Sequence, residues 1–203
     1  MKLITAPASP YSRKVKALLY ESNQMGDVEL LNVKTSPVAV DEGVQAANPL
    51  GKIPCLLRDT DPALYDSRVI CRFLDARSGG QFYPDGSIWD VLTIEATADG
   101  ILDSALSMVY EKRFRDESIQ SEAWLNAQKS KVLNGVAALN ETWMSHLNGP
   151  IHMGHIAVGC ALGYLDFRLD DLGWRAENEA LADWYAEFQS REAMKKTEPF
   201  DPA

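Results

Sequence analysis

The stretch "NPLGKIPCLLR" (residues 48–58) places Asn, Pro and Gly residues directly before an apolar run. Gly and Pro interrupt regular structure, so the first part predicts a turn and the apolar part predicts a strand. The sequence "DTDPA" (59–63) is a second turn signal, and "LY" (64–65) fits the returning arm of a hairpin. The stretch therefore predicts a turn, a strand and a hairpin in succession.

The segments on either side of this stretch alternate between strand and helix. Upstream, "KLIT" (2–5) and "VELLNV" (28–33) are apolar runs that predict strands, with a helix predicted between them over residues 10–22. Downstream, residues 66–80 predict a helix, because apolar residues recur every three or four positions and two glycines close it. Residues 1–78 are thus expected to form a βαβ unit followed by a hairpin and a helix.

The chain changes character after the predicted linker "GGQFYPDG" (79–86). All five tryptophans lie beyond it, which predicts a separate helical module, residues 87–203, with an aromatic core that includes Trp124. Ser87 and Asp90 have the spacing of a capping box at the first of its helices. The expected helices cover residues 87–115, 121–147, 155–169 and 178–190.

Composition excludes several classes of partner. The chain has 203 residues and a formal net charge of −9, whereas nucleic-acid binding needs a basic surface. Its three cysteines, Cys55, Cys71 and Cys160, are odd in number and show no metal-ligand spacing, which predicts reduced thiols. No apolar run reaches the ~18 residues that suggest a membrane span, and the N-terminus lacks a signal-peptide pattern. We expect a cytoplasmic protein with no nucleic-acid, membrane or metal partner.

The start of the first helix carries two hydroxyl groups. Ser9 occupies the expected N-cap position and Pro10 the first helical position, a frequent helix start. Ser12 lies inside the first turn. Local physics by itself predicts a structural cap, and any further role depends on the rest of the chain.

Several motifs together resemble those of the cytosolic glutathione transferases, in particular bacterial members of the serine type. The resemblance covers nearly the whole chain, and its most specific motif is the run at residues 48–54. It implies an α/β plus all-α architecture, with an N-terminal thioredoxin-like, glutathione-binding domain followed by an all-helical C-terminal domain. The motifs are "SPYSRKV" (9–15), "NPLGKIP" (48–54), Asp66-Ser67, "GCALGYLDFR" (159–168) and "KKTEPFDP" (195–202).

The resemblance also implies residues that bind glutathione. A cis bond before Pro54 would turn the backbone of Ile53 toward the ligand. The cysteinyl part of glutathione would then pair with Ile53 as an added strand pairs with a sheet edge. Ser67, at a helix N-terminus, would hold the γ-glutamyl carboxylate, with Asp66 facing the α-amino group. Lys52 is a candidate for the glycyl carboxylate.

Ser9 corresponds to the residue that contacts the glutathione sulfur, with Ser12 as the weaker alternative. A free thiol of pKa ~8.5 is only about 3% ionised at pH 7. Lowering that pKa by about two units needs ~2.7 kcal/mol of preferential anion stabilisation. One hydrogen bond to a charged group supplies roughly 1.5–3 kcal/mol and a helix N-terminus roughly 0.3–1 kcal/mol. Cap and catalytic residue can therefore be the same serine.

The implied function is conjugation of the glutathione thiolate to electrophilic small organic compounds, as in detoxification. Glutathione is then a co-substrate, no cofactor is needed, and a homodimer is expected. The expected pocket for the electrophile is formed by Tyr11, Met108, Tyr110 and Phe114. Two alternatives stay open: a glutathione-dependent peroxidase or reductase, and a transferase-like binding or regulatory protein without catalysis. Serine rather than cysteine at position 9 disfavours thiol exchange.

One motif departs from the family pattern. Where family members start a core helix with Ser/Thr-x-x-Asp, this chain reads His152-Met153-Gly154-His155. This predicts an under-capped helix, and His155→Asp is expected to add ~1 kcal/mol. The two histidines lack a third ligand and do not predict a metal site.

Overall fold

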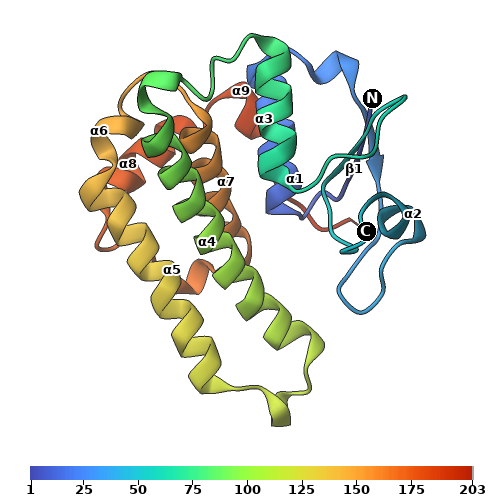
Figure 1. Ribbon diagram of the computed structural model, residues 1–203. Helices are drawn as coiled ribbons and strands as arrows, with labels where there is room; N and C mark the ends of the chain where they lie inside the picture. The colour runs from blue at the N-terminus through green and yellow to red at the C-terminus, as the bar shows by residue number, and fades with distance from the viewer. Residues whose placement is uncertain (203) are drawn as a thin grey trace. The chain divides into compact units, whose positions relative to one another are not determined.

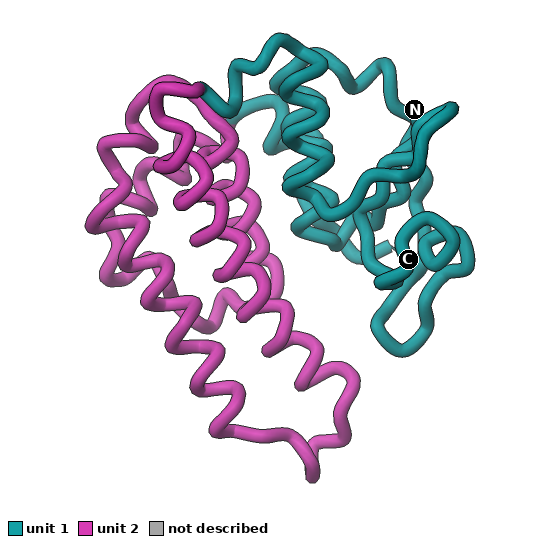
Figure 2. Tube along the Cα trace, in the orientation of Figure 1, with its two compact units in different colours: residues 1–84, 191–203 teal, residues 85–190 magenta. Residues whose placement is uncertain are grey.

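The computed structural model describes residues 1–202 and divides into two compact units. Unit 1 contains residues 1–84 together with the tail from Arg191, and unit 2 contains residues 85–190 (Figure 2). The tail, assigned from the sequence to the helical module, thus belongs to unit 1. Both the α/β character of the first unit and the helical character of the second match the predicted fold class.

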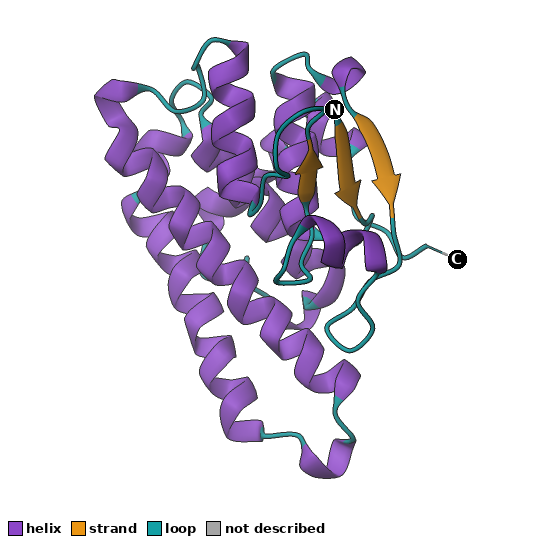
Figure 3. Ribbon diagram, turned by 45° about the vertical axis from the view of Figure 1, so that its right-hand side comes forward, coloured by secondary structure: helices purple, strands orange, loops and turns teal. Residues whose placement is uncertain are grey.

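Unit 1 is built on a three-stranded sheet with the order β2-β1-β3 (Figure 3). The central strand β1 (Lys2–Thr5) pairs parallel with β2 (Glu29–Asn32) and antiparallel with β3 (Cys55–Leu57). The predicted βαβ unit is therefore confirmed. The predicted hairpin is reduced to one isolated bridge between Leu56 and Leu64.

Two of the helices in unit 1 were predicted and two were not. The expected helices are α1 (Pro10–Glu21) and α3 (Ser67–Ser78), which pack against each other, and α3 ends at Gly79 with φ +106°. The short helix α2 (Glu42–Ala47) begins where the Asp41 carboxylate accepts the Val44 N–H at 3.1 Å.

The second unpredicted helix, α9 (Glu192–Lys196), contacts α1. Arg191 pairs with both carboxylate oxygens of Glu21 at 2.8 and 2.7 Å. Arg13, only 4% exposed, donates to the Met194 carbonyl at 3.2 Å. These charge-assisted bonds, between residues distant in sequence, attach the tail to α1.

Unit 2 is entirely helical, and α4 packs along both α5 and α7 (Figure 1). Helix α7 is apolar all round and is buried from its first residue to Leu165, as expected for a central helix. Gly135 on α5 lies so close to α4 that a Cβ there would come within 2.7 Å of Ile101. The helices are α4 (Ile88–Phe114), α5 (Glu122–Thr142), α6 (Met144–Leu147), α7 (Met153–Arg168) and α8 (Glu179–Phe188).

Two local predictions for unit 2 were wrong. Ser87 precedes α4, but its side chain makes no capping bond, and Asp90 instead faces the His146 ring at 3.3 Å. Trp124, expected in the core, is 48% exposed, and its indole N–H donates to the Ser107 hydroxyl on α4 at 3.2 Å. Trp89 is 78% exposed, so the aromatic residues of unit 2 are only partly core residues.

The predicted under-capping of the helix at His152 was also wrong. The Gly154 N–H donates to His152 Nδ1 at 3.1 Å, and the His152 N–H donates to His155 Nδ1 at 3.2 Å. The two imidazoles therefore form a reciprocal capping box, with ring nitrogens in place of hydroxyl and carboxylate oxygens. Because position 155 already supplies an acceptor, the stabilisation expected from His155→Asp no longer has a basis.

Residues 1–202 contain no group of three or more His, Cys, Asp or Glu side chains arranged for a metal ion. Within the same residues, no helix has both the length and the apolar character needed to cross a membrane.

Asp75 on α3 holds the segment that follows this helix. Its carboxylate, 4% exposed, accepts the backbone N–H of Phe82 at 2.7 Å and that of Tyr83 at 3.2 Å. In Asp75→Asn, one oxygen becomes a donor that faces another donor, so we expect a loss of about 1–2 kcal/mol in the free energy of unfolding. Urea unfolding measures this loss. Asp85→Asn, at an exposed position, should change stability by less than about 0.5 kcal/mol, and equal effects of the two variants would disprove the anchoring role of Asp75.

Candidate functional site

Ser9 is the N-cap of α1, as its sequence position predicts. Its backbone is extended (φ −81°, ψ 118°), and its Oγ accepts the Ser12 N–H at 3.2 Å. A hydroxyl that accepts through a lone pair keeps its own proton for a second partner. Ser9 is half-buried, so this O–H can reach a ligand at the N-terminus of the helix.

Ser12 has a different environment. Its side chain is fully buried, and its Oγ has no hydrogen-bond partner within residues 1–202. Because a ligand cannot approach a fully buried hydroxyl without displacing its neighbours, the geometry favours Ser9 over Ser12 as a contact for a bound group.

Asn48 organises the turn that precedes β3. Its side-chain amide donates to the Lys52 carbonyl at 2.9 Å, and its Oδ1 accepts the Leu50 N–H at 3.0 Å. Gly51 has φ +64°, a conformation that favours glycine, and a Cβ there would lie 3.1 Å from Val40. Asn48, 2% exposed, was not among the predicted site residues, although Asn before a Pro-rich turn is a recognisable signal.

The turn ends in a cis peptide bond between Ile53 and Pro54, which confirms that prediction. Ile53 is half-buried, Pro54 is buried, and the Lys52 side chain is exposed. The next residue, Cys55, donates its thiol to the Lys52 carbonyl at 3.1 Å. Burial raises the pKa of Cys55 to about 11, against the opposing effect of its hydrogen bond with Asn48. Cys55 is therefore a neutral thiol and not a reactive thiolate.

Asp66 and Ser67 lie at the start of α3, as predicted. The Asp66 carboxylate caps the helix by accepting the Arg68 N–H at 3.0 Å, and it pairs with the Arg68 guanidinium at 2.9 Å. Burial acts to raise the pKa of Asp66, but the bonds and charge of Arg68 outweigh it and lower the pKa. Ser67 is 3% exposed and is the first residue of the helix. An anionic carboxylate and a helix N-terminus thus adjoin each other here.

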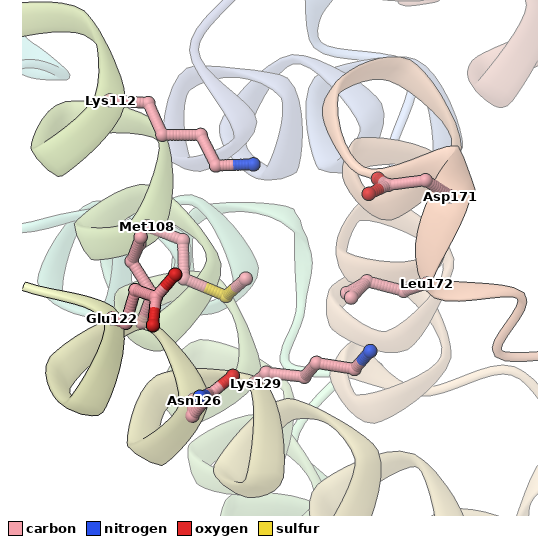
Figure 4. A pocket seen from close by; sticks show the side chains of 8 residues that line it. Met108, Lys112, Glu122, Asn126, Lys129, Asp171 and Leu172 are labelled. Carbon is pink, nitrogen blue, oxygen red and sulfur yellow. The ribbon is translucent and has the colours of Figure 1, made fainter. Parts of the chain in front are cut away.

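Unit 2 contains a cavity of about 310 Å³, formed by α4, α5 and the turn after α7 (Figure 4). Met108, one of the four residues expected to contact an electrophile, lines it. Tyr110 and Phe114 form an edge-to-face pair, with ring centroids 5.2 Å apart, and are not among the lining residues. Tyr11 belongs to unit 1.

Polar groups on the cavity rim were not predicted from the sequence. Lys112 on α4 and Lys129 on α5 extend toward the open space, and the Asp171 carboxylate faces it from the opposite side (Figure 4). Their positions in the sequence are those of ordinary solvent-exposed residues, so no local signal marks them.

Known proteins support the same architecture. The family models "Glutathione S-transferase, N-terminal domain" and "Glutathione S-transferase, C-terminal domain" match residues 3–82 and 122–187. An uncharacterized GST-like protein, YibF from Escherichia coli K12, is 31% identical over 98% of both chains.

Two solved structures are more similar to the chain in sequence than YibF is. A glutathione transferase family member from Pseudomonas fluorescens Pf-5, with bound glutathione, is 41% identical, with a TM-score of 0.96 over 98% of this chain and 99% of that one. A structure from the same organism with bound S-(propanoic acid)-glutathione is 40% identical, with a TM-score of 0.91 over 99% and 100% of the two chains. On this evidence the chain belongs to the glutathione S-transferase family.

Proposed function

We propose that this protein binds glutathione and transfers its thiolate to electrophilic small organic compounds. The observation that carries the proposal is the half-buried Ser9 hydroxyl at the N-terminus of α1, with its proton available to a ligand. Glutathione bound to the Pseudomonas relative supports binding of the same tripeptide by this chain.

In the proposed reaction, the Ser9 O–H donates a hydrogen bond to the glutathione sulfur. This bond and the positive end of the α1 dipole stabilise the thiolate relative to the thiol, so the proton is released to solvent near neutral pH. The thiolate sulfur then bonds to the electrophilic carbon, and a leaving group departs with its electron pair. Glutathione is consumed as a co-substrate, and the step needs no resident cofactor.

The remaining glutathione contacts are proposed from the family resemblance, and the positions of the residues are compatible with them. The Ile53 backbone, beside the cis bond to Pro54, would pair with the cysteinyl residue. The Ser67 N–H, at the start of α3, would bind the γ-glutamyl carboxylate, and the Asp66 carboxylate would bind the α-amino group. The exposed Lys52 ammonium would meet the glycyl carboxylate.

The electrophile is proposed to use the cavity that Met108 lines. Three of its eight lining residues, Met108, Leu125 and Leu172, are apolar and can contact the organic part of a co-substrate. The relative with bound S-(propanoic acid)-glutathione supports a site that accepts glutathione carrying a substituent on sulfur, here one that ends in a carboxyl group.

Two measurements on the purified protein test this proposal. Calorimetric titration with glutathione should show saturable binding, and turnover should be detected with a neutral aryl halide such as 1-chloro-2,4-dinitrobenzene. Cumene hydroperoxide and a mixed disulfide serve as comparison substrates. Binding without turnover of any electrophile would favour the non-catalytic alternative. A reaction confined to hydroperoxides would replace conjugation by the peroxidase function.

We also propose that the protein is a homodimer, with each chain providing the same surface across a two-fold axis. Light scattering at micromolar concentration should then give twice the 22.5 kDa mass of the chain. A mass equal to one chain over a tenfold concentration range would contradict the dimer.

A further inference from the structure

We propose that Arg13 positions Ser9 by fixing the first turn of α1 to the tail helix α9. This inference rests on the proposed function, because it adds a positioning residue to the same reaction. It assigns Arg13 no contact with glutathione, since the arginine acts only through the serine. All of the residues involved belong to unit 1.

The backbone joins Arg13 directly to Ser9. The Arg13 N–H donates to the Ser9 carbonyl at 2.9 Å, which is the first hydrogen bond of the helix. The neighbouring Ser12 N–H donates to Ser9 Oγ at 3.2 Å. Helix ends open more readily than helix centres, because fewer bonds hold them. The orientation of the Ser9 hydroxyl therefore depends on how firmly this one turn is held.

The side chain of Arg13 holds the same turn from outside the helix. Its guanidinium Nη2 donates to the Met194 carbonyl at 3.2 Å, and the two residues are only 4% and 1% exposed. A charge-assisted bond that is shielded from water is stronger than an exposed one. Met194 lies in α9, which packs against α1. The bond therefore joins the turn that begins at Ser9 to a second helix.

The charge of Arg13 is unusual for such a buried position. In the part of the chain that the structure describes, no carboxylate forms an ion pair with the guanidinium, and its Nε has no hydrogen-bond partner. Burying a charge without a carboxylate costs free energy, and an apolar side chain of similar volume would avoid this cost. Stability alone thus does not explain an arginine here, whereas the need to hold Ser9 does.

The opposite end of α1 offers a matched control. Glu21, the last residue of α1, accepts from the Arg191 guanidinium at 2.8 and 2.7 Å, so it also joins α1 to the tail. It lies roughly two helical turns beyond Arg13. Glu21→Ala therefore removes a charged attachment of the tail but leaves the turn at Ser9 in place. The two variants separate positioning of Ser9 from a general loss of tail contacts.

Amide hydrogen exchange of the ligand-free protein, followed by NMR, tests the attachment without relying on catalysis. Arg13→Met should accelerate exchange of the Ser12 N–H about fivefold more than that of the Ser22 N–H, which donates to the Leu18 carbonyl at the far end of α1. Glu21→Ala should show the reverse, after correction of the Ser22 rate for its changed neighbour. Equal acceleration at both ends would report only a loss of overall stability and would overturn the inference.

The thiol of bound glutathione gives the second readout. Arg13→Met should raise its pKa by about 0.5 to 1 and lower kcat at pH 6.5 about 3- to 10-fold, because less of the thiol is then ionised. The KM for glutathione should change less than about twofold, since the peptide contacts remain. Arg13→Lys, whose ammonium can still donate to the Met194 carbonyl, should recover most of the loss. Glu21→Ala should leave the thiol pKa unchanged.

Failure of the proposed function and failure of this inference give different results. If the wild type binds glutathione without lowering the pKa of its thiol, the proposed role of Ser9 fails, and the inference fails with it. If the wild type lowers this pKa and Arg13→Met lowers it equally, only the inference is wrong. A loss in Arg13→Met that Arg13→Lys reverses and Glu21→Ala does not reproduce would support it.

Discussion

Ser9→Ala should reduce turnover about 10- to 100-fold near pH 6.5, as expected for loss of one charge-assisted hydrogen bond to the thiolate. The affinity for glutathione should change only a few-fold, because the contacts to its peptide backbone remain. The apparent pKa of the bound thiol should rise toward that of free glutathione. Stopped-flow titration of thiolate absorbance and steady-state kinetics between pH 6 and 8 measure both quantities.

Because Ser9 also caps α1, the experiment needs a variant that separates the two roles. Ser9→Thr retains both the hydroxyl and the capping acceptor, so it should recover most of the activity. Ser9→Ala should also cost about 1 kcal/mol of stability through the lost cap, which urea unfolding reports separately. If Ser9→Ala retained full turnover over this pH range, Ser9 would have no part in thiolate stabilisation.

Acidification should destabilise the protein through the histidine capping box of α7. Both Nδ1 atoms accept backbone N–H groups, so the cap requires neutral rings that carry their proton on Nε2. Protonation of either ring adds a proton at Nδ1, which then faces the backbone N–H that Nδ1 accepted before, so two donors oppose each other. His152, 7% exposed, has its pKa lowered to about 4, mainly by burial and further by the charges that His155 and His146 would carry.

The sign of the pH effect follows from this lowered pKa. Between pH 6.5 and about 4, His152 takes up a proton in the unfolded chain but not in the folded one. Stability therefore falls as the pH falls, and this residue alone should cost about 3 kcal/mol by pH 4. The neighbouring His146 faces the Asp90 carboxylate at 3.3 Å.

Urea unfolding of the wild type and of His152→Asn at several pH values tests this expectation. Asparagine retains a capping acceptor but does not titrate, so the variant should lose less stability below pH 6.5. His146→Gln, which changes the neighbouring histidine outside the cap, should keep most of the wild-type pH dependence. Parallel curves for wild type and His152→Asn would show that His152 does not control acid stability.

The sequence was sufficient where the structure depends on near neighbours. The Ser9 cap joins residues three apart, and the cap formed by Asp66 joins residues two apart. The turn at residues 48–54 is held mainly by the side chain of Asn48 and its own neighbours. Bonds of this range are encoded by residue type and spacing, so the starts of α1 and α3 could be predicted from the residues, whereas the cis bond at Pro54 was expected only from the family resemblance.

Tertiary structure decided the features that depend on burial or on contacts distant in sequence. The pair formed by Glu21 and Arg191 assigns the tail to unit 1, although they lie 170 residues apart. Helical spacing placed Trp124 inward, but the packing of α5 on α4 left it exposed.

The histidines of α7 show most clearly what could not be predicted from the sequence. His152 and His155 are only three residues apart, and the prediction of an under-capped helix was still wrong. An aspartate offers an acceptor at neutral pH in almost any environment, whereas imidazole does so only while it is neutral and in one tautomer. The sequence determined where these rings stand on α7, and burial lowers the pKa of His152 so that its ring remains a neutral acceptor.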